Sequence, residues 1–345
     1  MSTTPCEISS FIVHKLVRDS EGANFNRQVG SSILTVNSPI QGLMDELNKK
    51  YIEQGGRTFG KFSDDTINYP ISTILTDAEI YSKSDNFYDL SIKILDHLVA
   101  KVKGKAVTGG WVVICLYNYN NQKFIAIAVV NEIIGAGINE SFEVEKSVYI
   151  DLSKLRHAGR VNLTQWQNQE DRYVSFIRGS HTSSEYFKEF LGCETTNDNV
   201  LESNKLIDVL NSYLDQQNYG YEERTAISNR AYDFLKAASK AKTPIFLEHL
   251  SNILLPTDPD SLRTFLASDQ NSISDGFIPD SRSLKRLIEL KTKSRYWDIK
   301  LSREAFKHGA EYDPQTGKLT IPVDDTEDKA MFAKQVQGLE EDDAD

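Results

Sequence analysis

The sequence predicts an α+β protein: an N-terminal part with a mostly antiparallel sheet and helices, then a mainly helical part that ends in a small β element. Two observations support this fold class. Apolar runs of strand length dominate the first 180 residues, most clearly the hairpin pattern at 111–130. Helix-period patterns then follow one another from about residue 183 to residue 291, before strand-like segments return.

In the N-terminal part, residues 8–18 are expected to form a strand, and residues 29–36 a weaker one. A helix is expected at 39–54, where Pro39 suits a first turn and apolar residues recur at helical spacing. The remaining elements expected here are a helix at 86–103, a hairpin of 111–117 and 123–130, and a strand at 142–152. The near-continuous apolarity of the hairpin suggests central strands covered on both faces.

The C-terminal part is expected to contain a series of short helices, several with good start signals such as Thr243-Pro244 and Asp258-Pro259. These helices are expected at 183–191, 200–217, 221–241, 244–254, 259–268 and 281–291, with strands at 294–301 and 317–322. We therefore expect three parts: an α+β domain at 1–192, a mainly helical domain with terminal strands at 193–323, and an acidic, disordered tail at 324–345.

Charge and cysteine content limit the functional class. The chain has a formal net charge of −11, and its last 22 residues contain nine acidic residues and two lysines. Most of the acidity is therefore in the tail, and any phosphate-binding surface must be local. The three cysteines are far apart, which argues against a disulfide framework and fits a reducing cytoplasm. The sequence lacks an apolar stretch of membrane-spanning length, so no membrane association is expected.

The partial catalytic motifs in the sequence are incomplete. Residues 55–61 have the glycine and lysine spacing of a phosphate-binding loop, but Phe62 stands where serine or threonine should reach Mg²⁺. Asp280 and Glu289 have the spacing of a magnesium-dependent nuclease core, which requires them on adjacent strands. Because 281–291 has helical spacing, Asp280 or Ser281 is better interpreted as the N-cap of a helix. The six histidines include no pair at metal-ligand spacing, so we expect no cofactor and no metal.

Basic residues concentrate in two segments. Residues 282–307 contain nine basic and three acidic residues, together with Tyr296 and Trp297. A basic segment with aromatic residues can bind a phosphate backbone, although a solvated helix face with ordinary lysines is an equally good interpretation. The second cluster contains Lys154, Arg156, His157, Arg160, Arg172 and Arg178.

Several stretches, taken in order, resemble the bacterial nucleoid-associated proteins of the NdpA/YejK family. The resemblance is carried by residues 58–64, 111–130, 149–156, 159–166, 172–179, 186–192 and 312–321, and so covers nearly the whole chain from about residue 8 to residue 322. It implies a cytoplasmic protein located at the nucleoid that binds double-stranded DNA, with RNA as a second candidate ligand, and has no established enzymatic activity. The family offers no catalytic residues to transfer.

We therefore expect a non-enzymatic DNA-binding protein whose affinity is mainly electrostatic. The residues expected to contact phosphate are Lys285, Arg286, Lys291, Lys293 and Arg295, and secondarily Arg156 and Arg160. The alternative is an adaptor that reaches the nucleoid by holding a DNA-processing or defence protein, and a less favoured alternative is a magnesium-dependent nuclease. Self-association is a further candidate property.

Overall fold

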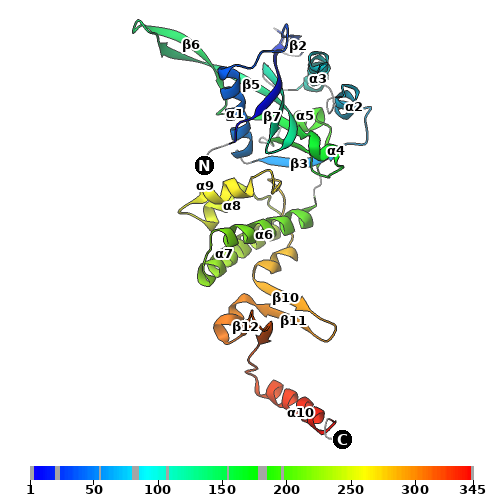
Figure 1. The fold of residues 1–345 in the computed structure, drawn as a ribbon, viewed down its shortest axis with the longest axis vertical. Coiled ribbons are helices and arrows are strands. Elements are labelled where there is room, and N and C mark those ends of the chain that lie inside the picture. Colours follow the sequence, from blue (N-terminus) through cyan, green and yellow to red (C-terminus); the bar gives the residue numbers. More distant parts are fainter. Residues whose placement is uncertain are drawn as a thin grey trace.

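A computed structural model describes residues 4–19, 24–53, 56–79, 85–105, 109–153, 155–177, 185–195 and 198–342. The molecule is elongated, with a sheet and its covering helices at one end, a group of helices in the middle, and two small hairpins beyond them (Figure 1). A last helix lies at the C-terminal end, separate from the rest (Figure 1). The α+β prediction is therefore confirmed.

In the described residues, nine strands form one sheet in the order β2-β1-β4-β5-β7-β8-β3-β9, with β6 paired to β5, and every pairing is antiparallel. The strands are β1 (Glu7–Arg18), β2 (Phe25–Gln28), β3 (Arg57–Phe62), β4 (Gly110–Tyr119), β5 (Gln122–Ile138), β6 (Val144–Asp151), β7 (His157–Asn162), β8 (Val174–Ile177) and β9 (Cys193–Thr195). Because β9 pairs with β3, the sheet continues past the junction expected at residues 192–193.

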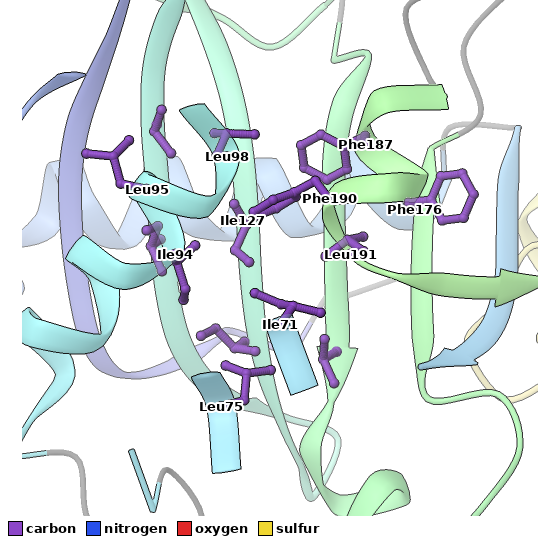
Figure 2. Packing of buried hydrophobic residues seen from close by; sticks show 14 of the residues in the cluster. Ile71, Leu75, Ile94, Leu95, Leu98, Ile127, Phe176, Phe187, Phe190 and Leu191 are labelled. Carbon is purple, nitrogen blue, oxygen red and sulfur yellow. The ribbon is translucent and has the colours of Figure 1, made fainter. Parts of the chain in front are cut away.

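Helices cover both faces of this sheet, as the apolarity of β4 and β5 predicted. One face packs on α2 (Ile71–Asp77), α3 (Phe87–Val102) and α5 (Glu185–Phe190), whose apolar side chains meet those of β5 and β8 (Figure 2). The other face packs on α1 (Ser38–Glu53), which buries Met44, Leu47 and Tyr51 as its periodicity predicted. The short helix α4 (Leu163–Gln167) follows β7.

The middle of the molecule has its own core. It is built from α6 (Asn199–Gln216), α7 (Tyr221–Ala241), α8 (Leu247–Leu254), α9 (Pro259–Leu266) and the 3₁₀ helix η1 (Ser283–Leu287). Asp198 caps α6 by accepting from the backbone N–H groups of Val200 and Leu201, and Asp258 caps α9 in front of Pro259. No helix in the described ranges has the length and hydropathy needed to cross a bilayer.

Two hairpins follow, β10 (Glu289–Lys293) with β11 (Asp298–Ser302), and β12 (Glu311–Asp313) with β13 (Lys318–Thr320). The 3₁₀ helix η2 (Arg303–His308) joins them. Helix α10 (Thr326–Asp342) occupies the segment expected to be a disordered tail. Its charged side chains suit a solvated helix, and Thr326, Glu327 and Asp328 form a first turn of suitable charge for a helix N-terminus.

Two element predictions were wrong. Residues 29–36 form no strand; the chain runs beside β1, where the Leu34 N–H donates to the Phe11 carbonyl without a continuing ladder. Residues 281–291 form a 3₁₀ helix and then a strand, instead of one α-helix. The spacing of Leu284 and Leu287 fits a single 3₁₀ turn as well as an α-helix. The pairing of β10 with β11 then decides the conformation of the remaining residues.

A buried ionic cluster joins the sheet to the helical part. Asp269, which follows α9, accepts from Arg57 of β3 at 2.7 Å between Oδ1 and Nη1, and from Arg160 of β7. Arg160 also donates to Asn48 Oδ1 at 3.1 Å and lies over the rings of Tyr51 and Phe124. One carboxylate from the helical part therefore pairs with two guanidinium groups that the sheet buries, and it offsets one of their two positive charges.

Two further contacts cross the same junction. Arg172 donates to Glu202 Oε1 at 2.5 Å and to Ser274 Oγ at 2.8 Å, and the Glu202 side chain is almost completely buried. Asp275 accepts from the backbone N–H of Leu247 at 2.6 Å and from that of Gly56. The two parts are thus held by charged hydrogen bonds at several positions, which fix their relative orientation.

The pKa of Asp269 shows how strong this arrangement is. Burial acts to raise the pKa, but Arg160 and Arg57 lower it, so the pKa falls from an ordinary 3.8 to about 2. Burial likewise acts to lower the pKa of Arg160, but Asp269 together with Tyr117 and Tyr51 raises it above the ordinary value. A carboxyl with a lowered folded-state pKa stabilises the fold above its unfolded pKa. The contribution of Asp269 is therefore present above about pH 4 and is lost as the pH falls through about 2.

We predict that Asp269→Asn lowers the free energy of unfolding by about 3–5 kcal/mol at pH 7, because it leaves two buried guanidinium groups without their carboxylate. Urea unfolding followed by circular dichroism measures this change. The matched control is Asp260→Asn, which breaks a pair between Arg263 and a largely exposed carboxylate and should cost about 0–1 kcal/mol. Equal losses in the two variants would show that the junction is not held by Asp269.

Candidate nucleic-acid interface

The hairpin β10–β11 carries the strongest concentration of exposed basic and aromatic side chains in the helical and C-terminal parts. Its register alternates between two faces: Lys291 lies opposite Lys300 and Lys293 opposite Asp298, whereas Leu290 lies opposite Leu301. The lysines therefore share one face and the apolar residues share the other. The apolar face borders a hollow of about 600 Å³, lined in part by Leu290, Ile299, Leu301, Phe306, Tyr312 and Leu319.

The turn of this hairpin presents aromatic rings together with a cation. Tyr296 is 85% exposed and Trp297 is 47% exposed, while Arg295 lies between them and the strand and contacts the Tyr296 ring. The turn is held by the Ser294 N–H, which donates to the Trp297 carbonyl at 2.7 Å. Large aromatic side chains exposed beside cations are typical of surfaces that bind nucleic acids by stacking and phosphate contact.

The basic residues predicted in this segment differ in their availability. Lys285, Lys293 and Arg295 are exposed, and in the described residues no ion pair is found for them. Arg286 is also exposed but donates to Asn204 and pairs with Asp208 of α6. Lys291 lies 3.9 Å from Asp298 between Nζ and Oδ2, a weak contact between two exposed groups. We call the surface formed by Lys285, Arg286, Lys291, Lys293, Arg295, Tyr296 and Trp297 the basic hairpin surface.

The described residues of the second predicted cluster do not form one exposed surface. Arg160 is buried and bound to Asp269, so it cannot reach a phosphate group, and we withdraw it from the predicted contacts. Arg172 is engaged with Glu202 in the same junction. Arg156 is exposed, but it belongs to the sheet end of the molecule, which the helical part separates from the basic hairpin surface (Figure 1). Lys154 and Arg178 lie outside the described residues.

His157 is the histidine of that cluster. Burial, and secondarily Arg156, lower its pKa to about 4. The imidazole is therefore neutral at physiological pH and adds no positive charge for DNA. Sequence spacing alone could not separate these buried side chains from exposed ones, because β7 is a central strand with both faces covered.

The α-helix that Asp280 was expected to cap is absent and Arg282 is the N-cap residue of η1, but the Asp280 carboxylate still forms hydrogen bonds at the start of η1. Its Oδ2 accepts from the backbone N–H of Ser283 at 2.9 Å, from the Ser283 hydroxyl at 3.0 Å and from the N–H of Arg282 at 3.2 Å. The hydrogen bond from the Ser283 N–H is the main cause of its lowered pKa. Glu289 Oε1 instead lies 3.0 Å from Lys300 Nζ. Within the described ranges, no group of three metal-ligating side chains is present.

The glycine-rich segment 55–61 leads into strand β3, not into a helix, and so lacks the helix N-terminus that a phosphate-binding loop requires. Glycine at position 60 is explained by packing in the sheet, because a Cβ there would lie 2.1 Å from the Glu194 carbonyl oxygen of the neighbouring strand. Gly55 is outside the described residues.

The fold and this surface define an elongated α+β protein with a basic, aromatic hairpin at one end. Residues 12–322 match the family model described as nucleoid-associated protein YejK. The chain therefore belongs to this family, as the resemblance indicated. It is 26% identical over 315 residues to a nucleoid-associated protein of Pseudomonas savastanoi pv. phaseolicola. The aligned residues cover 90% of this chain and 94% of the relative.

A nucleoid-associated protein of Azotobacter vinelandii is 25% identical over 315 residues, with 90% of this chain and 93% of the relative covered. One from Pseudomonas syringae pv. tomato is likewise 25% identical over 315 residues, covering 90% and 94%. Family membership supports a nucleoid-associated role and agrees with the nucleoid location expected from the sequence.

We predict that Asp280→Ala lowers the free energy of unfolding by about 1 kcal/mol through loss of the cap.

We also predict that the unaltered protein leaves supercoiled plasmid intact in Mg²⁺ or Mn²⁺, as followed by gel electrophoresis. Metal-dependent nicking that disappears in Asp280→Ala would contradict the capping interpretation and restore the nuclease hypothesis.

Proposed function

We propose that this protein is a non-enzymatic, nucleoid-associated protein that binds double-stranded DNA through the basic hairpin surface. The observation that carries the proposal is the hairpin turn, where exposed aromatic rings lie within a few residues of exposed cations that form no ion pair within the described ranges. Family membership supports the same role. Arg156 would be a secondary contact, separate from this surface.

The physical basis of binding would be neutralisation of phosphate charge. A cation that contacts phosphate releases condensed counterions, so affinity falls steeply as salt rises. Because the whole chain has a net charge of −11, the attraction must come from this local surface and acts over about a Debye length, roughly 10 Å at 0.1 M salt. The contacts would be to the backbone and therefore tolerant of sequence, and RNA offers the same phosphate groups.

We predict that reversing Lys285, Lys293 and Arg295 to glutamate weakens affinity for a duplex at low salt by at least about tenfold. The slope of log affinity against log salt should also decrease by about 1 for each lost phosphate contact. Fluorescence anisotropy with a labelled duplex at several salt concentrations measures both quantities. The affinity for a single-stranded RNA of the same length, measured in parallel, shows whether RNA shares the surface.

The matched control reverses Lys236, Lys240 and Lys242 to glutamate. These lysines belong to α7 and its C-cap, so the change in net charge is the same but lies away from the hairpin. The control should keep at least about a third of the original affinity. An equal loss in both variants, or an unchanged salt slope in the hairpin variant, would remove this surface from the account. Protein partners that remain bound after nuclease treatment would then favour the adaptor hypothesis.

The acidic C-terminal segment would act as a competitor for the same surface. Helix α10 follows β13 after a connection of a few residues, which keeps its acidic residues at high local concentration near the hairpins. Its first turn contains Glu327 and Asp328, and it exposes Met331, Phe332 and Val336. Carboxylates held close to the basic hairpin surface would occupy cations that otherwise contact phosphate.

We predict that deleting residues 324–345 tightens duplex binding at low salt by about three- to tenfold, with a smaller effect at high salt because the competing attraction is screened. The same anisotropy titration measures it. A full-length variant with the nine acidic residues changed to their amides separates charge from chain length and should bind as tightly as the truncated protein. Unchanged affinity in both proteins would leave the segment with no role in competition.

A further inference from the structure

Strands β5 and β6 extend beyond the sheet as a two-stranded arm (Figure 1). Strand β5 pairs with β4 and β7 only as far as Val130. From Asn131 to Ile138, its pairing in the described residues is with β6 alone. An isolated two-stranded ribbon is at best marginally stable in water, so an arm of this length is expected to be supported by another surface.

One face of the arm carries an apolar stripe, interrupted by Glu132 and Lys146, that no element of the described residues covers. The register places Ile134 opposite Val148, and Ile138 opposite Val144, with Ile150 on the same face. Ile134 is 67% exposed and Ile138 is 75% exposed. We call these five residues the apolar arm face. Contiguous exposed apolar side chains of this extent mark an interaction site.

On the opposite face of the arm, the Tyr149 side chain covers part of the strands. The Tyr149 ring lies against Gly135, where an added Cβ would come within 2.9 Å of a ring carbon. An added Cβ at Gly137 would lie 2.3 Å from the Ser147 hydroxyl oxygen. The glycines therefore let Tyr149 and Ser147 lie close to the strands on this side, where Ile133 and Tyr149 are 48% and 49% exposed, less than Ile134 and Ile138 on the apolar arm face.

Charge excludes DNA as the ligand of the arm and favours protein. Five acidic residues lie on the arm and its tip, against one basic residue, Lys146; they are Glu132, Glu140, Glu143, Glu145 and Asp151. A phosphate backbone would be repelled, and so would an anionic lipid surface. An apolar face of this size with an acidic tip needs a partner that offers an apolar strip next to positive charge.

The base of the same arm offers that combination. Lys15 pairs in register with Trp111, and Trp111 with Val130, so these side chains lie on the same side of the sheet as Ile134. The Lys15 ammonium lies 4.2 Å from the centre of the Trp111 ring. Around them is an open hollow of about 440 Å³, lined in part by Lys15, Arg18, Gly110 and Trp111, and also by Glu132, which accepts from Trp111 Nε1 at 2.8 Å.

The tip of the arm is shaped to fill such a hollow. Phe142 is 91% exposed between Glu140 and Glu143. The Asn139 side chain orders the tip by accepting from the N–H groups of Ser141 and Glu143, each at 3.0 Å. The base and the tip are separated by eight residues, roughly 26 Å of strand. Two arms laid antiparallel would therefore bring each tip to the base of the other arm.

We propose that two copies of this chain associate through their arms, face to face and antiparallel, with Phe142 of each copy in the hollow beside Trp111 of the other. The apolar arm faces cover each other, and the acidic tips meet Lys15 and Arg18. Each copy uses the same surface, so the contact is isologous and closes as a two-fold dimer. The basic hairpin surface lies at the other end of each molecule and stays free (Figure 1).

Sedimentation equilibrium of the full chain tests this interface. The unaltered protein should be dimeric at micromolar concentration. Changing Ile134 and Val148 to aspartate should raise the dimer dissociation constant by at least about a hundredfold, because it places charges in the apolar contact. The matched control changes Ile133 and Ser147 to aspartate, on the opposite face of the same strands, and should leave the dissociation constant within about threefold.

Engineered disulfide formation tests the antiparallel arrangement. Cys6, Cys115 and Cys193 are buried, so introduced thiols can be followed without interference. Phe142→Cys combined with Lys15→Cys should give a disulfide-linked dimer with oxidised glutathione, whereas Phe142→Cys alone should not. A monomeric unaltered protein at all concentrations, equal effects of the two aspartate variants, or linkage by Phe142→Cys alone would overturn the proposal. Such results would leave the prediction of DNA binding untouched.

Discussion

The arrangement of the molecule depends on one carboxylate. Asp269 lies at the junction between the sheet and the helical part, where its carboxylate, which is 20% exposed, pairs with the buried guanidinium groups of Arg57 and Arg160. A buried guanidinium without a partner would cost several kcal/mol, so the two parts are favoured in the one orientation that satisfies both arginines. Asp275 and Glu202 add hydrogen bonds to the same junction.

This junction also decides which basic residues can act at the surface. Arg57, Arg160 and Arg172 hold the two parts together, and their positive charge is partly offset by Asp269 and Glu202. The lysines and arginine of the hairpin beyond the helical part have no comparable burial, and most of their charge faces solvent. The protein is acidic as a whole, so it can present positive potential only where such cations are not paired.

Much of the fold could be predicted from the sequence because local patterns and tertiary packing agree there. Helix α3 buries the apolar residues that its periodicity indicated, and the β4–β5 hairpin has the expected central position. Prediction failed for 281–291, where the helical spacing extends over barely one turn and a partner strand further along the chain decides the outcome. The roles of Arg160 and Arg172 were also not visible in the sequence, because their partners lie 109 and 30 residues away.

We propose that nucleic acid contacts the hairpin end of the molecule and not the sheet. Amide hydrogen exchange measured by mass spectrometry, with and without a saturating duplex at low salt, tests it most directly. We expect amide hydrogen exchange to slow in residues 289–302 on binding and to stay unchanged in residues 157–162. Protection of the β7 segment, or of no segment in the hairpin, would contradict it.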